Sequence, residues 1–240
     1  MNVLLIGYGK MGKAIEQVAL QRGHSIAYTL DLPNSNLLAN ISPKTVDVAI
    51  EFTQPEAAYH NIYQCLSQGI PVVSGTTGWL YRKEEIEQYC QEKGGAFFYA
   101  ANFSIGVNIF FKLNELLAKL MRQHSNYHVA LEETHHTTKK DAPSGTAITL
   151  AEGIIQNMPS KKQWVNAPIK QEDTISITSQ RIPNVPGTHI VTYTSLLDTL
   201  EIKHTAHSRE GFALGAVLVA EWIRNKKGIL SMQDFLQLDC

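Results

Sequence analysis

Two adjacent histidines, His135-His136, stand close in the sequence to two adjacent lysines, Lys139-Lys140. An imidazole exchanges protons readily near neutral pH, and a lysine ammonium can donate a proton or bind an anion. The run that follows, Asp141 to Gly145, carries turn residues, and Ser144 within it is a good candidate for a helix N-cap. Proton donors beside a helix start indicate acid–base chemistry on a small substrate that carries carboxylates.

A strand and a helix must hold these groups in place. Tyr127 to Leu131 alternates as a half-buried strand does, and Ala147 to Ile155 has apolar residues at helical spacing. The N–H groups of Gly145 and Thr146 would then be unpaired donors at a helix N-terminus, which is a ready anion site. A single histidine or lysine is more often an ordinary surface or core residue. Their coincidence at one strand-to-helix turn favours a substrate site.

The N-terminal segment has the pattern of a dinucleotide-binding unit. Asn2 to Ile6 predicts a strand buried on both faces, Gly7-Tyr8-Gly9-Lys10-Met11-Gly12 follows at once, and Lys13 to Arg22 runs at helical spacing. In this pattern the first glycine permits a tight turn, the second lets a pyrophosphate approach the backbone, and the third lets helix pack on strand. The glycine triplet alone is a weak signal, but its place between a strand and a helix strengthens it.

Further residues of a cofactor site are expected where successive strands end. A strand from Ser25 to Leu30 ends at Asp31, nineteen residues beyond Gly12, where an acidic side chain can bind a ribose 2′-hydroxyl. Later strands also end in small or polar loops, which in a doubly wound sheet line the cofactor crevice. The residues expected there are Phe52, Thr53, Gly75, Thr76, Thr77, Ala100, Ala101, Asn102 and Phe103.

The order of the expected elements predicts an α/β fold. A Rossmann-like dinucleotide-binding domain would span residues 1–104, and an α+β substrate-binding and oligomerisation domain would span residues 105–208. The second domain should contain a mostly antiparallel sheet, because its β-rich runs alternate and are broken by Pro and Gly. Residues 209–240 would form a helix that returns to the first domain. The segment Leu32 to Thr45 is too short for a full crossover helix.

The composition excludes several classes of partner and cofactor. With 240 residues, a net charge of −1 and no long basic run, the chain is a poor match for nucleic acid or a membrane surface. Cys65, Cys90 and Cys240 are widely spaced, which implies neither a disulfide framework nor a metal site. The apolar run 212–220 is too short to span a bilayer, and the first residues lack the pattern of a signal peptide. We expect a soluble, cytoplasmic protein.

The string Glu133 to Ala147 closely resembles the signature of the dihydrodipicolinate reductase (4-hydroxy-tetrahydrodipicolinate reductase) family, which acts in the diaminopimelate route to lysine. The resemblance covers nearly the whole chain; the signature and the segment around Asn102 are highly specific. Further similar segments are Gly7 to Gly12, Glu51 to Thr53, Gly75 to Gly78, Ala101 to Asn108, His207 to Arg209 and Gly215-Ala216. The resemblance implies that a homotetramer reduces 4-hydroxy-tetrahydrodipicolinate, a cyclic dicarboxylate, to tetrahydrodipicolinate with NAD(P)H.

The resemblance also implies roles for single residues. His135 stands where the family has its proton donor/acceptor, and Lys139 stands where it has a further proton donor. His136, Gly145 and Thr146 stand where substrate is held. The chemistry agrees, because reduction of an imine-like ring needs a hydride from the nicotinamide and a proton supplied nearby.

The chain departs from the family pattern at the cofactor's ribose. Leu32 follows Asp31, at the place where an Arg often meets the 2′-phosphate of NADPH, and the Asp31 carboxylate repels that phosphate. Lys10 and Lys13 could partly serve a phosphate. We therefore expect NADH to be used at least as well as NADPH, which stays possible, and we expect no metal cofactor.

Two other classes of protein stay open. The first is a different Rossmann-type NAD(P)-dependent oxidoreductase that acts on a small carboxylate or sugar. It has no particular need for paired histidines with a lysine four residues after the first. The second is a non-catalytic NAD sensor or scaffold, in which an intact set of proton donors is not expected.

Overall fold

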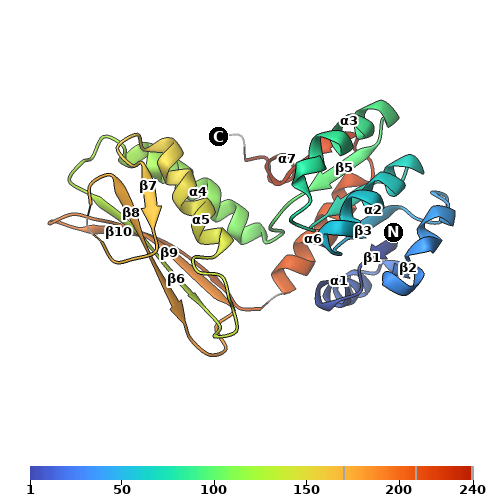
Figure 1. Ribbon diagram of the computed structural model, residues 1–240, viewed down its shortest axis with the longest axis horizontal. Coiled ribbons are helices and arrows are strands. Elements are labelled where there is room, and N and C mark those ends of the chain that lie inside the picture. The colour runs from blue at the N-terminus through green and yellow to red at the C-terminus, as the bar shows by residue number, and fades with distance from the viewer. Residues whose placement is uncertain (170, 209, 239–240) are drawn as a thin grey trace. The chain divides into compact units, whose positions relative to one another are not determined.

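A computed structural model of the protein describes residues 1–169, 171–208 and 210–238 (Figure 1). The chain divides into two compact units, one made of Met1–Ile105 with Glu210–Cys240 and the other of Gly106–Arg209. Arg209, at our expected boundary of the last segment, and Cys240 lie outside the described residues. Among the described helices, none is both long and apolar enough to cross a membrane.

A parallel sheet forms the centre of the first unit, in the strand order β11-β5-β4-β3-β1-β2. Strand β1 divides its side chains between two hydrophobic cores, with Val3 and Leu5 in one and Leu4 and Ile6 in the other. An unbroken apolar run is typical of a strand buried on both faces. The strands are β1 (Asn2–Ile6), β2 (Ser25–Leu30), β3 (Val48–Glu51), β4 (Val72–Ser74), β5 (Ala96–Tyr99) and β11 (Gly228–Leu230).

Helices cover both faces of this sheet (Figure 1). Helices α1 (Lys10–Gln21) and α6 (Glu210–Ile223) pack on one core, and α2 (Pro55–Ser67) and α3 (Lys83–Lys93) pack on the other. The short helix α7 (Met232–Leu236) joins the α1–α6 side. The strand order reverses between β1 and β3, and in open α/β sheets ligands bind beyond the carboxyl ends of the strands at such a point. The Rossmann-like character predicted from the sequence is confirmed.

The connection from β2 to β3 is short and contains a 3-10 helix, η1 (Leu32–Asn40), in place of a long crossover helix. Asp31 is its N-cap: the Asp31 carboxylate accepts a hydrogen bond from the Leu32 amide at 2.9 Å. In return, the Asn34 side-chain oxygen accepts one from the Asp31 amide at 2.7 Å. These reciprocal bonds fix the backbone at the point where β2 ends.

The second unit is a sheet with helices on one face. Helices α4 (Ile105–Met121) and α5 (Gly145–Asn157) contribute to one core with β6, β8 and β9, and Figure 1 shows both on the same side of the sheet. In the described part of this unit, no helix covers the opposite face. The strands are β6 (His128–His135), β7 (Gln163–Val165), β8 (Thr174–Arg181), β9 (Gly187–Thr194) and β10 (Thr199–Ala206).

The expectation of a mostly antiparallel second sheet was wrong, because the sheet is mixed. Its order is β10-β9-β6-β8-β7, in which β9 pairs antiparallel with β10 and β6, whereas β8 pairs parallel with β6 and β7. A tight hairpin can reverse a strand, but the chain between β6 and β8 contains α5, and a crossover that includes a helix returns the strand in the same direction. Alternation in the sequence identifies a strand without giving its direction.

Candidate active site

A cavity of about 600 Å³ opens at the carboxyl ends of β1, β2 and β3 in the first unit. Helix α2 and η1 complete its wall with Ser35, His60 and Gln64, which the sequence analysis did not single out. Of the predicted cofactor residues, those that line the cavity are Gly7, Tyr8, Gly9, Asp31, Phe52 and Thr53.

The glycines of the first loop are required by close approach of backbone atoms. Gly7 has φ +94°, and a Cβ added there would lie 2.0 Å from the Phe52 carbonyl oxygen. A Cβ on Gly12 would lie 2.1 Å from the Gly7 carbonyl oxygen, so that helix and strand could not pack. At Gly9 nothing lies within 4 Å of the added atom. Open space beside the N-terminus of α1 is what a bound pyrophosphate needs.

The loops after β3 and β4 meet at one aromatic ring. A Cβ on Gly75 would lie 2.2 Å from the Phe52 ring, which therefore packs directly on the Gly75 backbone. The ring centroids of Phe52 and Phe103 are 5.4 Å apart. Three predicted cofactor residues are thus brought together. The other predicted residues lie at the start of α1 and in the loops after β4 and β5: Lys10, Met11, Gly12, Thr76, Thr77, Ala100, Ala101 and Asn102.

Glu51 links the loops after β3 and β4 through hydrogen bonds. It ends β3 and is fully buried. Its Oε1 accepts hydrogen bonds from the Thr53 amide at 3.0 Å and the Thr76 hydroxyl at 2.8 Å, and its Oε2 accepts one from the Ser74 hydroxyl at 2.6 Å. Burial raises the pKa of Glu51, although these hydrogen bonds oppose the rise. Glu51 thereby fixes Thr53 and Thr76, both predicted to contact the cofactor.

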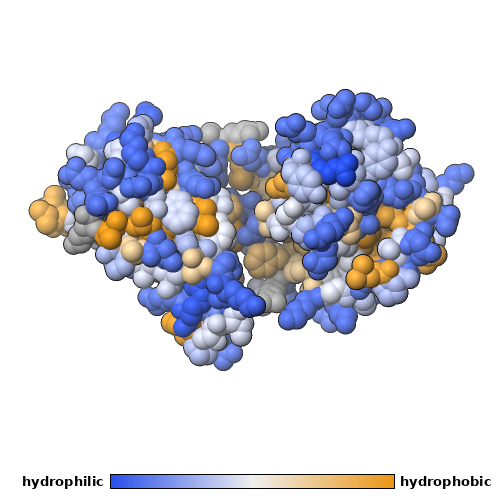
Figure 2. Space-filling view, in the orientation of Figure 1, coloured by the Kyte–Doolittle hydropathy of each residue, from blue (hydrophilic) through white to orange (hydrophobic). Residues whose placement is uncertain are grey.

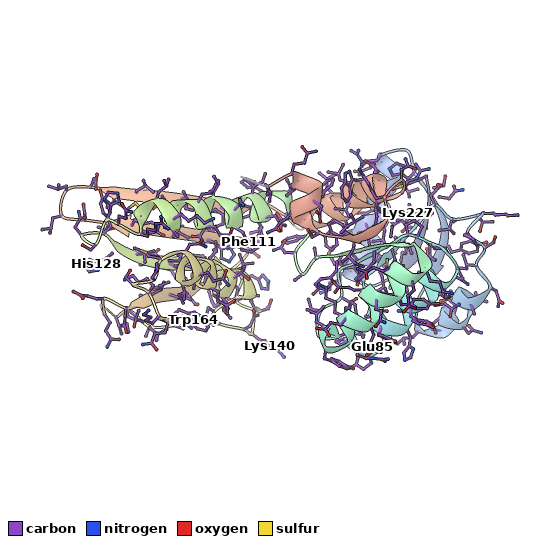
Figure 3. All side chains as sticks on the ribbon, turned by 90° about the horizontal axis from the view of Figure 1, so that it is seen from above. Glu85, Phe111, His128, Lys140, Trp164 and Lys227 are labelled. Atoms are coloured by element: carbon purple, nitrogen blue, oxygen red, sulfur yellow. The ribbon has the colours of Figure 1, made fainter. Side chains whose placement is uncertain are left out.

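The predicted substrate residues lie in the second unit, where β6 ends and α5 begins. His135 is the last residue of β6 and is 8% exposed, whereas His136 and Lys139 are partly exposed in the connecting loop. The Lys139 ammonium pairs with the Asp141 carboxylate at 2.8 Å. Figure 3 shows Lys140 in this loop, far from the other end of β6 at His128.

Helix α5 begins at Gly145, with Ser144 as the N-cap that the sequence predicted. The Ser144 hydroxyl accepts a hydrogen bond from the Ala147 amide at 3.2 Å. Gly145 and Thr146 are the first two residues of the helix, so their N–H groups have no carbonyl one turn earlier to bind. They remain suited to an anionic group.

Both ring nitrogens of His135 face protein atoms. Its Nδ1 lies 3.3 Å from the Pro186 carbonyl oxygen, which only an N–H can satisfy. Its Nε2 lies 3.3 Å from Nε2 of His189 and 3.5 Å from the Glu133 carboxylate. Burial lowers the pKa of His189, so this second imidazole favours its neutral form. Its Nε2 also lies 3.1 Å from the Ser144 hydroxyl.

Glu133 is the centre of this cluster. It is 1% exposed, both carboxylate oxygens lie 3.1 Å from the Ser144 amide nitrogen, and Oε1 lies 3.3 Å from the Arg181 guanidinium. Burial opposes ionisation, but hydrogen bonds from His135, His189 and Ser144 outweigh it and hold the pKa of Glu133 well below its usual range. Glu133 is therefore an ionised carboxylate whose partners are two imidazoles, an amide and a guanidinium.

Glu133, His135 and His189 also have the residue types of a metal site, with ligand atoms all within 4.8 Å of one another. The Arg181 guanidinium binds the same carboxylate and opposes a second cation there. Hydrogen bonds already account for the facing atoms of all three side chains. We therefore interpret the group as a hydrogen-bond network.

Comparison with known proteins identifies the family. Residues 1–103 match the family described as "Dihydrodipicolinate reductase, N-terminus", and residues 106–236 match the one described as "Dihydrodipicolinate reductase, C-terminus". The chain belongs to the dihydrodipicolinate reductase family. The resemblance stated from the signature is confirmed. Membership makes the chain an NAD(P)H-dependent oxidoreductase of the diaminopimelate route to lysine.

Individual relatives agree with the family. The chain is 48% identical over 236 residues to a 4-hydroxy-tetrahydrodipicolinate reductase of Christiangramia forsetii, with 98% of each chain covered. It is 38% identical over 210 residues to the reductase of the same name from Methanosarcina barkeri, covering 85% of this chain and 78% of that one. A dipicolinate-bound dihydrodipicolinate reductase from Paenisporosarcina sp. TG-14 shares the fold, with TM-score 0.81, 22% identity, and 98% and 99% of the chains covered.

Several residues that hold the site together were not predicted from the sequence. Glu133 could have been found, because it lies two residues before His135 and therefore on the same face of β6. Arg181 and His189 gave no local signal, since they come from β8 and β9 and reach Glu133 only through sheet pairing.

Proposed function

We propose that the protein reduces 4-hydroxy-tetrahydrodipicolinate to tetrahydrodipicolinate, with the first unit holding the cofactor and the second holding the substrate. The observation that carries the proposal is the signature itself, in which proton donors from β6 and its following loop precede the free N–H groups of α5. The reaction replaces the 4-hydroxyl, lost as water, with a hydride from the nicotinamide, and it consumes one proton. The protein must therefore bind a dicarboxylate and supply a proton.

The roles on the substrate side follow from charge and position. Gly145 and Thr146 bind a substrate carboxylate through their N–H groups at the helix N-terminus, and His136 contacts the substrate beside them. Lys139 has a partly exposed ammonium and donates the proton. His135 acts as proton donor/acceptor. The relative from Paenisporosarcina binds dipicolinate, an aromatic ring with two carboxylates, which supports a substrate of this class.

The cofactor is NADH in preference to NADPH. The Asp31 carboxylate lines the cavity and is held there by its hydrogen bond from the Leu32 amide. A fixed negative charge accepts a ribose 2′-hydroxyl and repels a 2′-phosphate. NADPH remains a possible but weaker cofactor, since Lys10 and Lys13 lie at the start of α1. The proposal includes no metal.

The protein is a cytoplasmic homotetramer. In the described residues of the second unit, one sheet face has no helix on it, and a cavity of about 1140 Å³ lies on that face. Polar side chains of the sheet such as Thr192 and Thr194 line much of the cavity, and the apolar Leu196 and Leu197 from the β9–β10 turn complete its wall. A sheet face without helices that has two exposed leucines at its edge supports association with further copies of the chain.

The assay that tests the reaction follows oxidation of NADH and NADPH with freshly condensed pyruvate and aspartate semialdehyde product as substrate. We expect turnover with both cofactors and a kcat/KM for NADH at least equal to that for NADPH. A ratio strongly in favour of NADPH would show that Asp31 does not set the preference. Folded protein that binds NADH and oxidises neither cofactor would point to a different Rossmann-type oxidoreductase.

Substitution tests the two assigned proton donors. His135→Gln and Lys139→Ala should each lower kcat by roughly 100- to 10,000-fold, the usual contribution of a positioned acid or base. NADH binding should be unchanged, because neither residue lies in the unit that contains the cofactor cavity. Near-normal turnover of either variant would remove the role assigned to that residue.

A further inference from the structure

One ion pair joins the first residue of the signature segment, 133–147, to a neighbouring strand of the sheet. Glu133 lies on β6, two residues before that strand ends, and Arg181 is the last residue of the neighbouring parallel strand β8. Their side chains meet at 3.3 Å, with Glu133 completely buried and the Arg181 side chain 20% exposed. Each partner makes further hydrogen bonds to a different part of the segment.

Arg181 holds the loop that carries Lys139. Its Nη2 donates to the carbonyl oxygen of Asp141 at 2.5 Å, and its Nε donates to that of Lys139 at 3.4 Å. The Lys139 ammonium pairs in turn with the Asp141 side chain. The guanidinium therefore fixes the backbone on both sides of residue 140. A planar fork of donors can do this, whereas the single nitrogen of a lysine cannot reach the same set of acceptors.

Glu133 holds the imidazole and the helix start. Its carboxylate lies 3.5 Å from Nε2 of His135 and accepts from the Ser144 amide, so the proton-exchanging ring and the N-cap of α5 share one anchor. His189 closes the cluster from β9, because its Nε2 faces both His135 and the Ser144 hydroxyl. Movement of Glu133 would displace the imidazole and the anion-binding N–H groups together.

We propose that the Glu133–Arg181 pair is the positioning unit of the active site, which sets Lys139, His135 and the start of α5 in one fixed arrangement. This role rests on the proposed function, which assigns the chemistry to those three groups. Buried ion pairs contribute little net stability, because desolvation of both charges offsets their attraction. In addition, this pair supplies directional hydrogen bonds to the loop that carries Lys139, to the His135 ring and to the start of α5. Both members are positioning residues and do not contact the reacting atoms.

The test compares Glu133→Gln, Arg181→Lys and the double variant with wild type. Glu133→Gln keeps the size of the side chain and removes its charge, and Arg181→Lys keeps the charge and removes the fork. Matched controls are Glu132→Gln, an exposed neighbour on the same strand, and Arg122→Gln, an exposed arginine just after α4. For each protein the melting temperature, the Kd for NADH, the Kd for dipicolinate, and kcat and KM for the substrate are measured.

Both single variants should lose on the order of 100-fold in kcat, the effect of a misplacement of about 1 Å at a catalytic group. Their Kd for NADH should stay within about twofold of wild type, because the cofactor cavity is in the other unit. The double variant should be no slower than the slower single variant, since the pair acts as a unit. Both controls should keep wild-type kinetics.

A merely structural role gives a different result. The variants would then melt earlier but show wild-type kcat when assayed as folded protein below their melting temperatures, and this outcome would overturn the proposal. If Glu133→Gln does not fold, Arg181→Lys carries the same test, because it keeps the ion pair's charges.

Failure of the proposed reaction is distinguishable from failure of the positioning unit. If wild type binds dipicolinate but does not turn over the substrate, the reaction assignment is wrong. The positioning unit is then judged by the Kd for dipicolinate, which should rise at least tenfold in Glu133→Gln, whose Ser144 anchor is weakened. An unchanged Kd in that case would contradict the proposal.

Discussion

At the scale of single residues, two buried carboxyl groups respond to their surroundings in opposite ways. Glu51 is bound by three hydroxyl groups and an amide, yet burial dominates and raises its pKa. Glu133 is bound by imidazoles and an amide with a guanidinium nearby, and these outweigh burial and lower its pKa. Cationic or strongly donating neighbours therefore decide which buried carboxyl group stays ionised.

The lowered pKa of Glu133 predicts how stability changes with acid. A carboxyl group whose pKa is lower in the folded state contributes stability above its unfolded pKa, about 4.5 here, and loses it as pH falls toward the folded value. Glu133→Gln should lower the free energy of unfolding by about 3 kcal/mol at neutral pH, since it leaves Arg181 without its partner.

Urea unfolding of wild type and Glu133→Gln between pH 7 and pH 3 measures this effect. The gap between the two proteins should be constant above pH 5 and shrink as pH falls below about 4.5. A gap that does not depend on pH would show that the glutamate is not ionised in the folded protein. Glu132→Gln, on the exposed face of the same strand, serves as the control.

The candidate site was predictable from the sequence where its residues are contiguous. The turn chemistry of 141–145 gives the N-cap at Ser144, and GxGxxG between a strand and a helix gives the loop at Gly7 to Gly12. His189 and Arg181 were not predictable, because a lone histidine or arginine in a β-rich run has no local feature that separates a buried partner from a surface residue. Only the pairing of β6 with β8 and β9 brings them to Glu133.

At the scale of elements, α6 shows how one helix can contain two glycines with different roles. A Cβ on Gly215 would lie 1.8 Å from the Phe103 carbonyl oxygen, so the helix backbone packs directly on the loop after β5. At Gly211, one turn earlier, no atom of the described residues lies within 4 Å of the added atom. Close backbone approach requires glycine at position 215. At position 211, a glycine only adds flexibility to the unfolded chain.

Alanine substitutions at these two positions should therefore differ in sign. Gly211→Ala should raise the free energy of unfolding by about 0.5–1 kcal/mol, the helix preference of alanine over glycine. Gly215→Ala should lower it by about 1–3 kcal/mol, the cost of overpacking, because the clash is with backbone that cannot rotate away. Urea unfolding monitored by circular dichroism measures both. Destabilisation by Gly211→Ala would show that α6 packs differently around its first turn.

Two of the three-residue strands, β7 and β11, were not predicted from the sequence. Residues 25–30 were expected to form a strand, and they form β2 with those bounds. Strands β7 and β11 each have three residues, too few to show a period of two. Their position depends on a neighbouring strand that offers free backbone groups.

At the scale of the whole molecule, the two units bury the faces of their sheets in different ways. The parallel sheet of the first unit has a hydrophobic core on each face, which the continuous apolar strands demand. The sheet of the second unit has its core on the helix side, and its strands alternate, with β6 burying every second residue. The uncovered face is therefore where a protein partner can add burial.

The turn from β9 to β10 also supports a protein partner on this face. Leu196 is 105% exposed and Leu197 is 91% exposed, and both belong to the wall of the cavity on the uncovered face. Figure 2 shows apolar surface at the end of the β9–β10 hairpin. Two adjacent leucines fully exposed to water are unfavourable in an isolated chain, which supports their burial against another copy of the protein.

Leu197→Asp should consequently break the assembly without unfolding the chain. The side chain makes little contact within its own unit, so substitution should change the stability of one chain by less than about 0.5 kcal/mol. In an assembly, the new carboxylate would be buried without a partner, which costs several kcal/mol per interface. Sedimentation equilibrium should give the mass of four chains for wild type and a smaller species for the variant. Tyr81→Asp, which changes a residue that is 85% exposed in the other unit, should keep the wild-type mass. A wild-type protein that sediments as one chain, or a variant that still sediments as four, would show that this face is not the subunit interface.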